Sequence, residues 1–171
     1  PGLTPHLSAL ESQALSFTEI EQVEGTGWTI AGMVASQCGV PLLNLADGNA
    51  LTSGDRFMSN ATCLGDLLSQ QGHQMHYKGG ASLAFAGKGA FYRTHGFHAQ
   101  GLDEIKTELP PTSPTTGWGL YDDTLYEQVW QGLLTQAQHD APLGLFMLTL
   151  DTHHPNGHAS GACRGMPYGN A

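Results

Sequence analysis

Residues 143–150 read Leu-Gly-Leu-Phe-Met-Leu-Thr-Leu, and this nearly unbroken apolar segment constrains the fold more than any other. A strand with one face in water alternates apolar and polar residues, whereas a strand of a parallel sheet is covered on both faces and is apolar throughout. The segment therefore predicts a central parallel strand. We expect an α/β fold with a mostly parallel sheet and helices on both faces.

Helix and strand signals alternate along the rest of the chain. One helix is expected to begin at Pro5 after a Thr4 cap, and another at Asp122 or Asp123. Between them, helices are expected at 29–37, from Asn60 or Thr62 to Gly72, and briefly near Phe91. Strands are expected at 15–23, 74–78 and 105–106, and an irregular loop at 109–116. The acidic pair 122–123 is interpreted as a helix cap and not as a metal site.

Length and charge limit the functions that the chain can have. Its 171 residues suit a single domain. The net charge is −9 with only six Lys and Arg residues, which argues against binding to nucleic acid or to an anionic membrane surface. No apolar run is long enough to span a membrane, and no signal peptide is recognisable. Pro1 falls inside a helix-start signal, so we expect the chain to be part of a longer protein.

The three cysteines are an odd number. Cys38 and Cys63 can pair across a short loop, which would leave Cys163 without a partner and would indicate an oxidising compartment. Three reduced cysteines, two of them buried, are the alternative. No Cys-x-x-Cys spacing suggests zinc.

The Gly-Thr-Gly-Trp-Thr stretch at 25–29 precedes a run of small and apolar residues. This pattern places Thr29 at a helix N-terminus, where backbone N–H groups can hold a phosphate and a hydroxyl can act as a nucleophile. A helix-capping role is the alternative for Thr29. Ligands of parallel sheets gather at the carboxyl ends of the strands, so Thr29 and His153, each following an expected strand, are predicted to face one cleft.

Several stretches resemble the membrane-bound phosphoglycerol transferases, a sulfatase-like group, and especially the branch that modifies periplasmic glucans. The resemblance covers nearly the whole chain, at residues 1–5, 25–39, 63–68, 85–88, 94–97, 118–124 and 148–155. It implies a fold like that of sulfatases and alkaline phosphatase, incomplete here, with 1–171 as one domain, the central part of the catalytic domain.

The resemblance also implies roles for individual residues. Thr29 would be the nucleophile that carries glycerol phosphate, and also a ligand of one divalent ion, Mn²⁺ or Mg²⁺. His153 would contact the substrate phosphate, unless it belongs to an ordinary polar loop, and His154 is a weaker candidate. Lys88 would supply a positive charge to the phosphate or lie on the surface, and Trp28 would line the glycerol pocket or pack in the interior.

The remaining metal ligands of the family would lie outside this chain, so the isolated segment is expected to be inactive. The resemblance implies phosphatidylglycerol as donor, a glucan as acceptor, and a bacterial inner-membrane enzyme that faces the periplasm and is anchored by a membrane span outside these residues. Two other interpretations stay open. The chain can belong to another enzyme of the superfamily, such as a sulfatase, a phosphodiesterase or a phosphoethanolamine transferase, or it can be a binding domain without activity.

Overall fold

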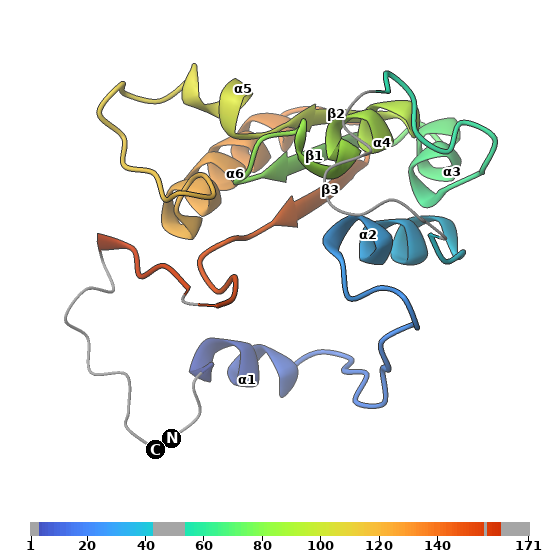
Figure 1. Ribbon diagram of the computed structural model, residues 1–171, viewed down its shortest axis with the longest axis horizontal. Coiled ribbons are helices and arrows are strands. Elements are labelled where there is room, and N and C mark those ends of the chain that lie inside the picture. The colour runs from blue at the N-terminus through green and yellow to red at the C-terminus, as the bar shows by residue number, and fades with distance from the viewer. Residues whose placement is uncertain (1–3, 43–53, 156, 162–171) are drawn as a thin grey trace.

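The computed structural model describes residues 4–42, 54–155 and 157–161 (Figure 1). Within these residues three strands form one parallel sheet in the order β2-β1-β3. They are β1 (Gln74–Gly79), β2 (Phe97–Gln100) and β3 (Leu143–Leu148). Met75 of β1 lies opposite Phe97 of β2 and Gly144 of β3. The predicted α/β class with a parallel sheet is confirmed.

Helices cover both faces of the sheet. They are α1 (Pro5–Glu11), α2 (Thr29–Cys38), α3 (Leu64–Gln70), the 3-10 helix η2 (Phe85–Gly87), α4 (Lys88–Thr94), α5 (Leu102–Lys106) and α6 (Asp122–Gln136). The larger apolar core joins α2 and α4 to one face and includes Ile30, Tyr77 and Phe91. A smaller core joins α5 and α6 to the other face and includes Ile105 and Leu125.

The apolar pattern of β3 has a direct structural cause. Phe146 and Leu148 pack against the larger core, while Leu145 and Met147 pack against the smaller one, so both faces of the strand are covered. The prediction of a central strand is nevertheless wrong for the described residues, because β1 occupies the middle of the sheet and β3 lies at one edge.

Two predicted strands are absent. Residues 15–23 have no regular structure, and Leu15, Phe17 and Ile20 are each more than 70% exposed, because no described strand pairs with this segment. Residues 105–106 lie in α5, and the strand precedes them at 97–100, where buried Phe97 and Ala99 alternate with exposed His98. The Glu104 carboxylate accepts a hydrogen bond from the Gly101 N–H and so caps α5.

The other predicted elements match closely. The helix predicted at 29–37 is α2, and Gly39 ends it in the left-handed conformation that glycine adopts without strain. The helix α1 begins at Pro5 as expected, but Thr4 makes no capping hydrogen bond and no residue of α1 is buried. In Figure 1, α1 lies away from the sheet.

Candidate active site

A pocket of about 450 Å³ opens at the carboxyl end of β3, beside the loop that follows β1. Thr29, the first residue of α2, lines it together with Lys88 at the start of α4 and His153 in the loop after β3. The structure therefore brings three of the predicted site residues together. The remaining lining residues are Ala81, Ser82, Phe85, Gly117, Trp118, Leu148, Thr149, Leu150 and Thr152.

Thr29 is exposed at the N-terminus of α2. Trp28 is the capping residue of this helix and makes no side-chain capping bond, so the alternative of Thr29 as the cap is wrong. The first N–H groups of a helix have no partner within the helix and carry partial positive charge. The Thr29 hydroxyl thus lies beside donors that suit an anionic phosphate.

His153 is half-buried in the loop that follows β3. Its Nδ1 lies 2.6 Å from the backbone oxygen of His154, and a carbonyl oxygen can only accept, so Nδ1 carries a proton and donates it. The Nε2 atom is then the ring nitrogen left for a ligand. A neutral ring offers a lone pair there, and a protonated ring offers a donor for a phosphoryl oxygen.

Aromatic rings form one wall of the pocket. The ring centroids of Trp118 and His153 are 4.4 Å apart, and Phe85 meets Trp118 edge to face at 6.3 Å. Trp118 belongs to the stretch 118–124 that resembles the phosphoglycerol transferases, but the sequence predicts no role for it. Its position in a loop far from Thr29 in the sequence explains this, since no local pattern links the two.

Lys88 is almost fully buried, at 2% exposure, so the alternative of a surface lysine is wrong. Its Nζ lies 5.3 Å from the centroid of the Phe85 ring. Burial lowers the pKa of Lys88 from 10.5 to about 8. A lysine with this pKa still carries most of its charge near neutral pH and can bind a phosphate as a point charge.

The other two predicted substrate residues lie differently. Trp28 is half-buried against the larger core and does not line the pocket. His154 is exposed, with its ring stacked on that of His153 at 5.0 Å. The packing alternative for Trp28 therefore agrees with the structure.

Two carboxylates hold the loop that carries His153. The Leu150 N–H donates to Oδ1 of Asp122 at 2.6 Å and the Asp151 N–H to Oδ2 at 3.2 Å, while the Asp122 N–H donates to Asp151 Oδ2 at 3.1 Å. Burial raises the pKa of Asp151 above its ordinary value. The prediction of a cap was wrong for this pair, because Tyr121 is the N-cap of α6 and Asp122 instead binds the chain after β3.

A disulfide joins Cys38, the last residue of α2, to Cys63, which precedes α3. Cys163 lies outside the described residues. Cys38, Cys63 and His95 are the one group of three potential metal ligands found among the described residues, and its two sulfurs are bonded to each other.

A divalent ion at Thr29 needs more ligands than this pocket offers. Its described lining has hydroxyl groups and one imidazole, but no carboxylate. Mg²⁺ and Mn²⁺ need several oxygen or nitrogen ligands at once, so the described residues do not by themselves form a site for either ion.

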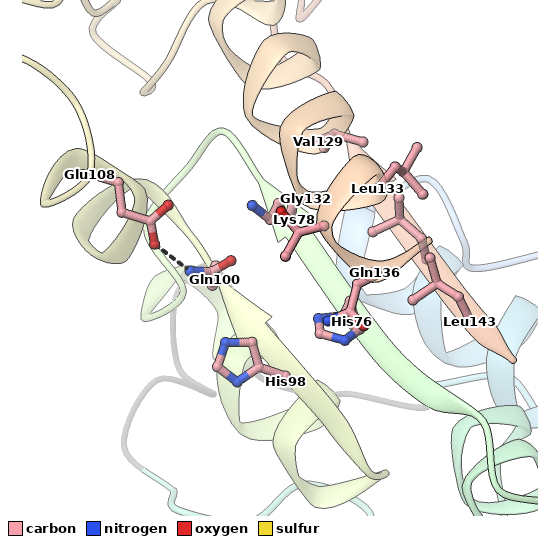
Figure 2. A pocket seen from close by; sticks show the side chains of 12 residues that line it. His76, Lys78, His98, Gln100, Glu108, Val129, Gly132, Leu133, Gln136 and Leu143 are labelled. Carbon is pink, nitrogen blue, oxygen red and sulfur yellow. Dashed lines mark hydrogen bonds between the residues drawn. The ribbon is translucent and has the colours of Figure 1, made fainter. Parts of the chain in front are cut away.

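A second pocket of about 230 Å³ lies between α6 and the face of β1 and β2 that carries His76, Lys78 and His98 (Figure 2). Burial lowers the pKa of His76, and the neighbouring His98 and Lys78 lower it further. The Nζ of Lys78 donates to the backbone oxygen of Gln128. None of the predicted site residues lies here, so the pocket at Thr29 is the candidate active site.

The chain resembles known proteins along almost its entire length. It is 44% identical over 169 residues to phosphoglycerol transferase I from Salmonella paratyphi B and equally to that from Salmonella typhi, a match that covers 98% of this chain and 22% of each relative. The chain thus spans about a fifth of the length of these relatives. No described helix has the length and apolar character that crossing a membrane requires.

The fold also resembles a solved structure. It matches the crystal structure of a protein in the alkaline phosphatase superfamily from Vibrio parahaemolyticus with a TM-score of 0.55 and 20% identity, over 75% of this chain and 31% of that one. Members of this superfamily are generally metal-dependent. The family model described as Sulfatase matches residues 1–166, and the chain therefore belongs to the sulfatase family.

Proposed function

We propose that the chain is the central part of the catalytic domain of a phosphoglycerol transferase, which moves glycerol phosphate from phosphatidylglycerol to a periplasmic glucan. The observation that carries the proposal is the meeting of Thr29, Lys88 and His153 in one pocket at the end of β3. A nucleophile, a cation and an imidazole are the groups that phosphoryl transfer requires. The name of the Salmonella relatives supports the same reaction class.

The reaction proceeds in two steps. The Thr29 oxygen attacks the phosphorus of phosphatidylglycerol, the bond from phosphorus to the diacylglycerol oxygen breaks, and diacylglycerol leaves with a proton. A hydroxyl group of the acceptor then attacks the phosphorus, the bond to Thr29 breaks, and the acceptor's proton passes to the Thr29 oxygen. Lys88 and Nε2–H of a protonated His153 ring donate to the phosphoryl oxygens during both steps, and the first turn of α2 adds backbone donors.

We further propose that the enzyme holds a divalent ion, Mn²⁺ or Mg²⁺, with Thr29 as one ligand and the others in segments outside these 171 residues. It also places the protein at the bacterial inner membrane with this domain in the periplasm. The Cys38–Cys63 disulfide supports that compartment, because disulfides persist where the environment is oxidising.

The test is a transfer assay with the full-length protein, fluorescent phosphatidylglycerol and a glucan acceptor. Thr29→Ala should lower transfer by roughly a hundredfold or more, since the covalent route is lost. Thr26→Ala is the matched control, because Thr26 belongs to the same glycine-rich turn but bonds to the Val23 backbone oxygen outside the pocket. Omission of the acceptor should leave a glycerophosphate adduct on Thr29 that mass spectrometry detects. Normal transfer by Thr29→Ala would refute the proposal.

A further inference from the structure

The two cysteines of the Cys38–Cys63 disulfide differ in burial. Cys63 is 1% exposed, whereas Cys38 is half-buried at the end of α2. A thiolate must approach a sulfur atom directly in order to attack a disulfide. Cys38 is the more exposed residue of the two, so we expect a thiol from solvent to attack Sγ of Cys38, with Cys63 as the sulfur that leaves.

An imidazole lies next to this leaving sulfur. Nε2 of His95 is 3.6 Å from Sγ of Cys63, and Nδ1 of the same ring is 2.7 Å from Oδ2 of Asp66. The carboxylate accepts from Nδ1–H, and a proton on Nε2 can then be donated to the sulfur. A hydrogen bond from an ionised donor stabilises a thiolate.

Asp66 fixes both partners of this contact. The same Oδ2 atom that holds the His95 ring also accepts the Cys63 backbone N–H at 2.8 Å. His95 is 2% exposed and its ring packs against Phe91, with centroids 5.0 Å apart. It is the one histidine among the fully buried side chains of the described residues. The imidazole is thus held at the sulfur by its hydrogen bond to the Asp66 carboxylate and by packing.

We propose that Cys38–Cys63 is a site of thiol–disulfide exchange, at which a dithiol reductant attacks Cys38 and His95 stabilises the departing Cys63 thiolate. The attacking thiolate forms a bond to Cys38 Sγ, the Cys38–Cys63 bond breaks, and its electron pair goes to Cys63, which takes a proton from Nε2 of His95. The second thiol of the reductant then attacks the mixed disulfide and releases Cys38. Two electrons pass to the protein, and the reductant becomes a disulfide.

The direction of attack can be tested without any substitution. The native protein is incubated with glutathione, free thiols are blocked with iodoacetamide, and peptides containing Cys38, Cys63 and Cys163 are analysed by mass spectrometry. Glutathione should be found on Cys38 and the blocking group on Cys63. Glutathione on Cys63, or an intact disulfide under conditions that reduce exposed disulfides, would overturn the proposal.

The role of His95 is tested by the rate of reduction with dithiothreitol. Asp66→Asn and His95→Gln should each slow reduction roughly tenfold, because a poorer leaving thiolate departs more slowly. His98→Gln is the matched control, since His98 is exposed on β2 and away from the disulfide. Circular dichroism before reduction identifies variants with native structure. Rates within twofold of the native protein in both Asp66→Asn and His95→Gln, each with a native circular dichroism spectrum and native thermal stability, would refute the role of His95.

Discussion

The indole of Trp118 lies against the imidazole of His153, with ring centroids 4.4 Å apart and planes inclined by 30°. Trp118 restricts the His153 ring on its pocket side, while the hydrogen bond from Nδ1 to the His154 backbone oxygen restricts the same ring at the other edge. Trp118→Ala should therefore lower kcat/KM by about tenfold, because the imidazole loses a fixed orientation. Trp118→Phe should retain most activity, as an aromatic face remains. Equal kinetics of Trp118→Ala and the native enzyme would show that the stacking has no role in the reaction.

The adjacent histidines should differ sharply in importance. His153→Ala removes the imidazole that we propose donates to the phosphoryl group and should reduce kcat by roughly a hundredfold. His154→Ala keeps the backbone oxygen that positions His153 and should change kcat by no more than about threefold. Both variants are compared in the transfer assay at saturating phosphatidylglycerol. Similar losses in the two variants would mean that the assignment to His153 is wrong.

Binding of a phosphodiester should depend on pH through Lys88, whose pKa is lowered by burial to about 8. The ammonium is charged below this pH, so affinity should fall as the pH rises through 8 and above. A phosphodiester does not titrate in this range. Lys88→Arg should remove the dependence, since arginine stays protonated. Affinity for glycerophosphocholine, measured by calorimetry from pH 6.5 to 9.5, checks this, and an unchanged profile in Lys88→Arg would contradict it.

Lys88 should also make the free energy of unfolding depend on pH. The folded chain holds the Lys88 proton less tightly than the unfolded chain, whose pKa is near 10.5, so unfolding is accompanied by proton uptake between these values. The free energy of unfolding should therefore rise as the pH increases from about 8 toward 10.5. Lys88→Met should lack this contribution. Urea unfolding of both proteins across this range measures the difference, and parallel curves would contradict the prediction.

Asp122 should contribute far more stability than its neighbour Asp123. Asp122→Ala leaves the N–H groups of Leu150 and Asp151 without their carboxylate partner, which should cost about 3 kcal/mol. Among the described residues the exposed Asp123 carboxylate bonds to Thr124 alone, and Asp123→Ala should cost less than about 1 kcal/mol. Chemical unfolding measures both. Equal losses would show that Asp122 acts only as a charge at the start of α6.

The sequence revealed those parts of the site that depend on local patterns. The turn of glycines before Thr29 and the apolar run of β3 each carry their own signal, and both elements occur where predicted. The strand expected at 15–23 has the right residues, but strands need a partner, and the described chain offers none. Trp118 and the burial of Lys88 depend on contacts between distant segments, which a single sequence does not display.

The parallel sheet has a consequence for how the site comes into being. β1 pairs with β2 across η2 and α4, but with β3 only after all of the chain between residues 79 and 143 has been placed, so β3 is the last of the three described strands to join the sheet. Contacts between distant residues cost more chain entropy and form slowly. Because His153 follows β3 directly, the imidazole joins Thr29 in the pocket only once β3 has paired with β1. A chain in which β3 has not yet paired would therefore lack the complete candidate pocket.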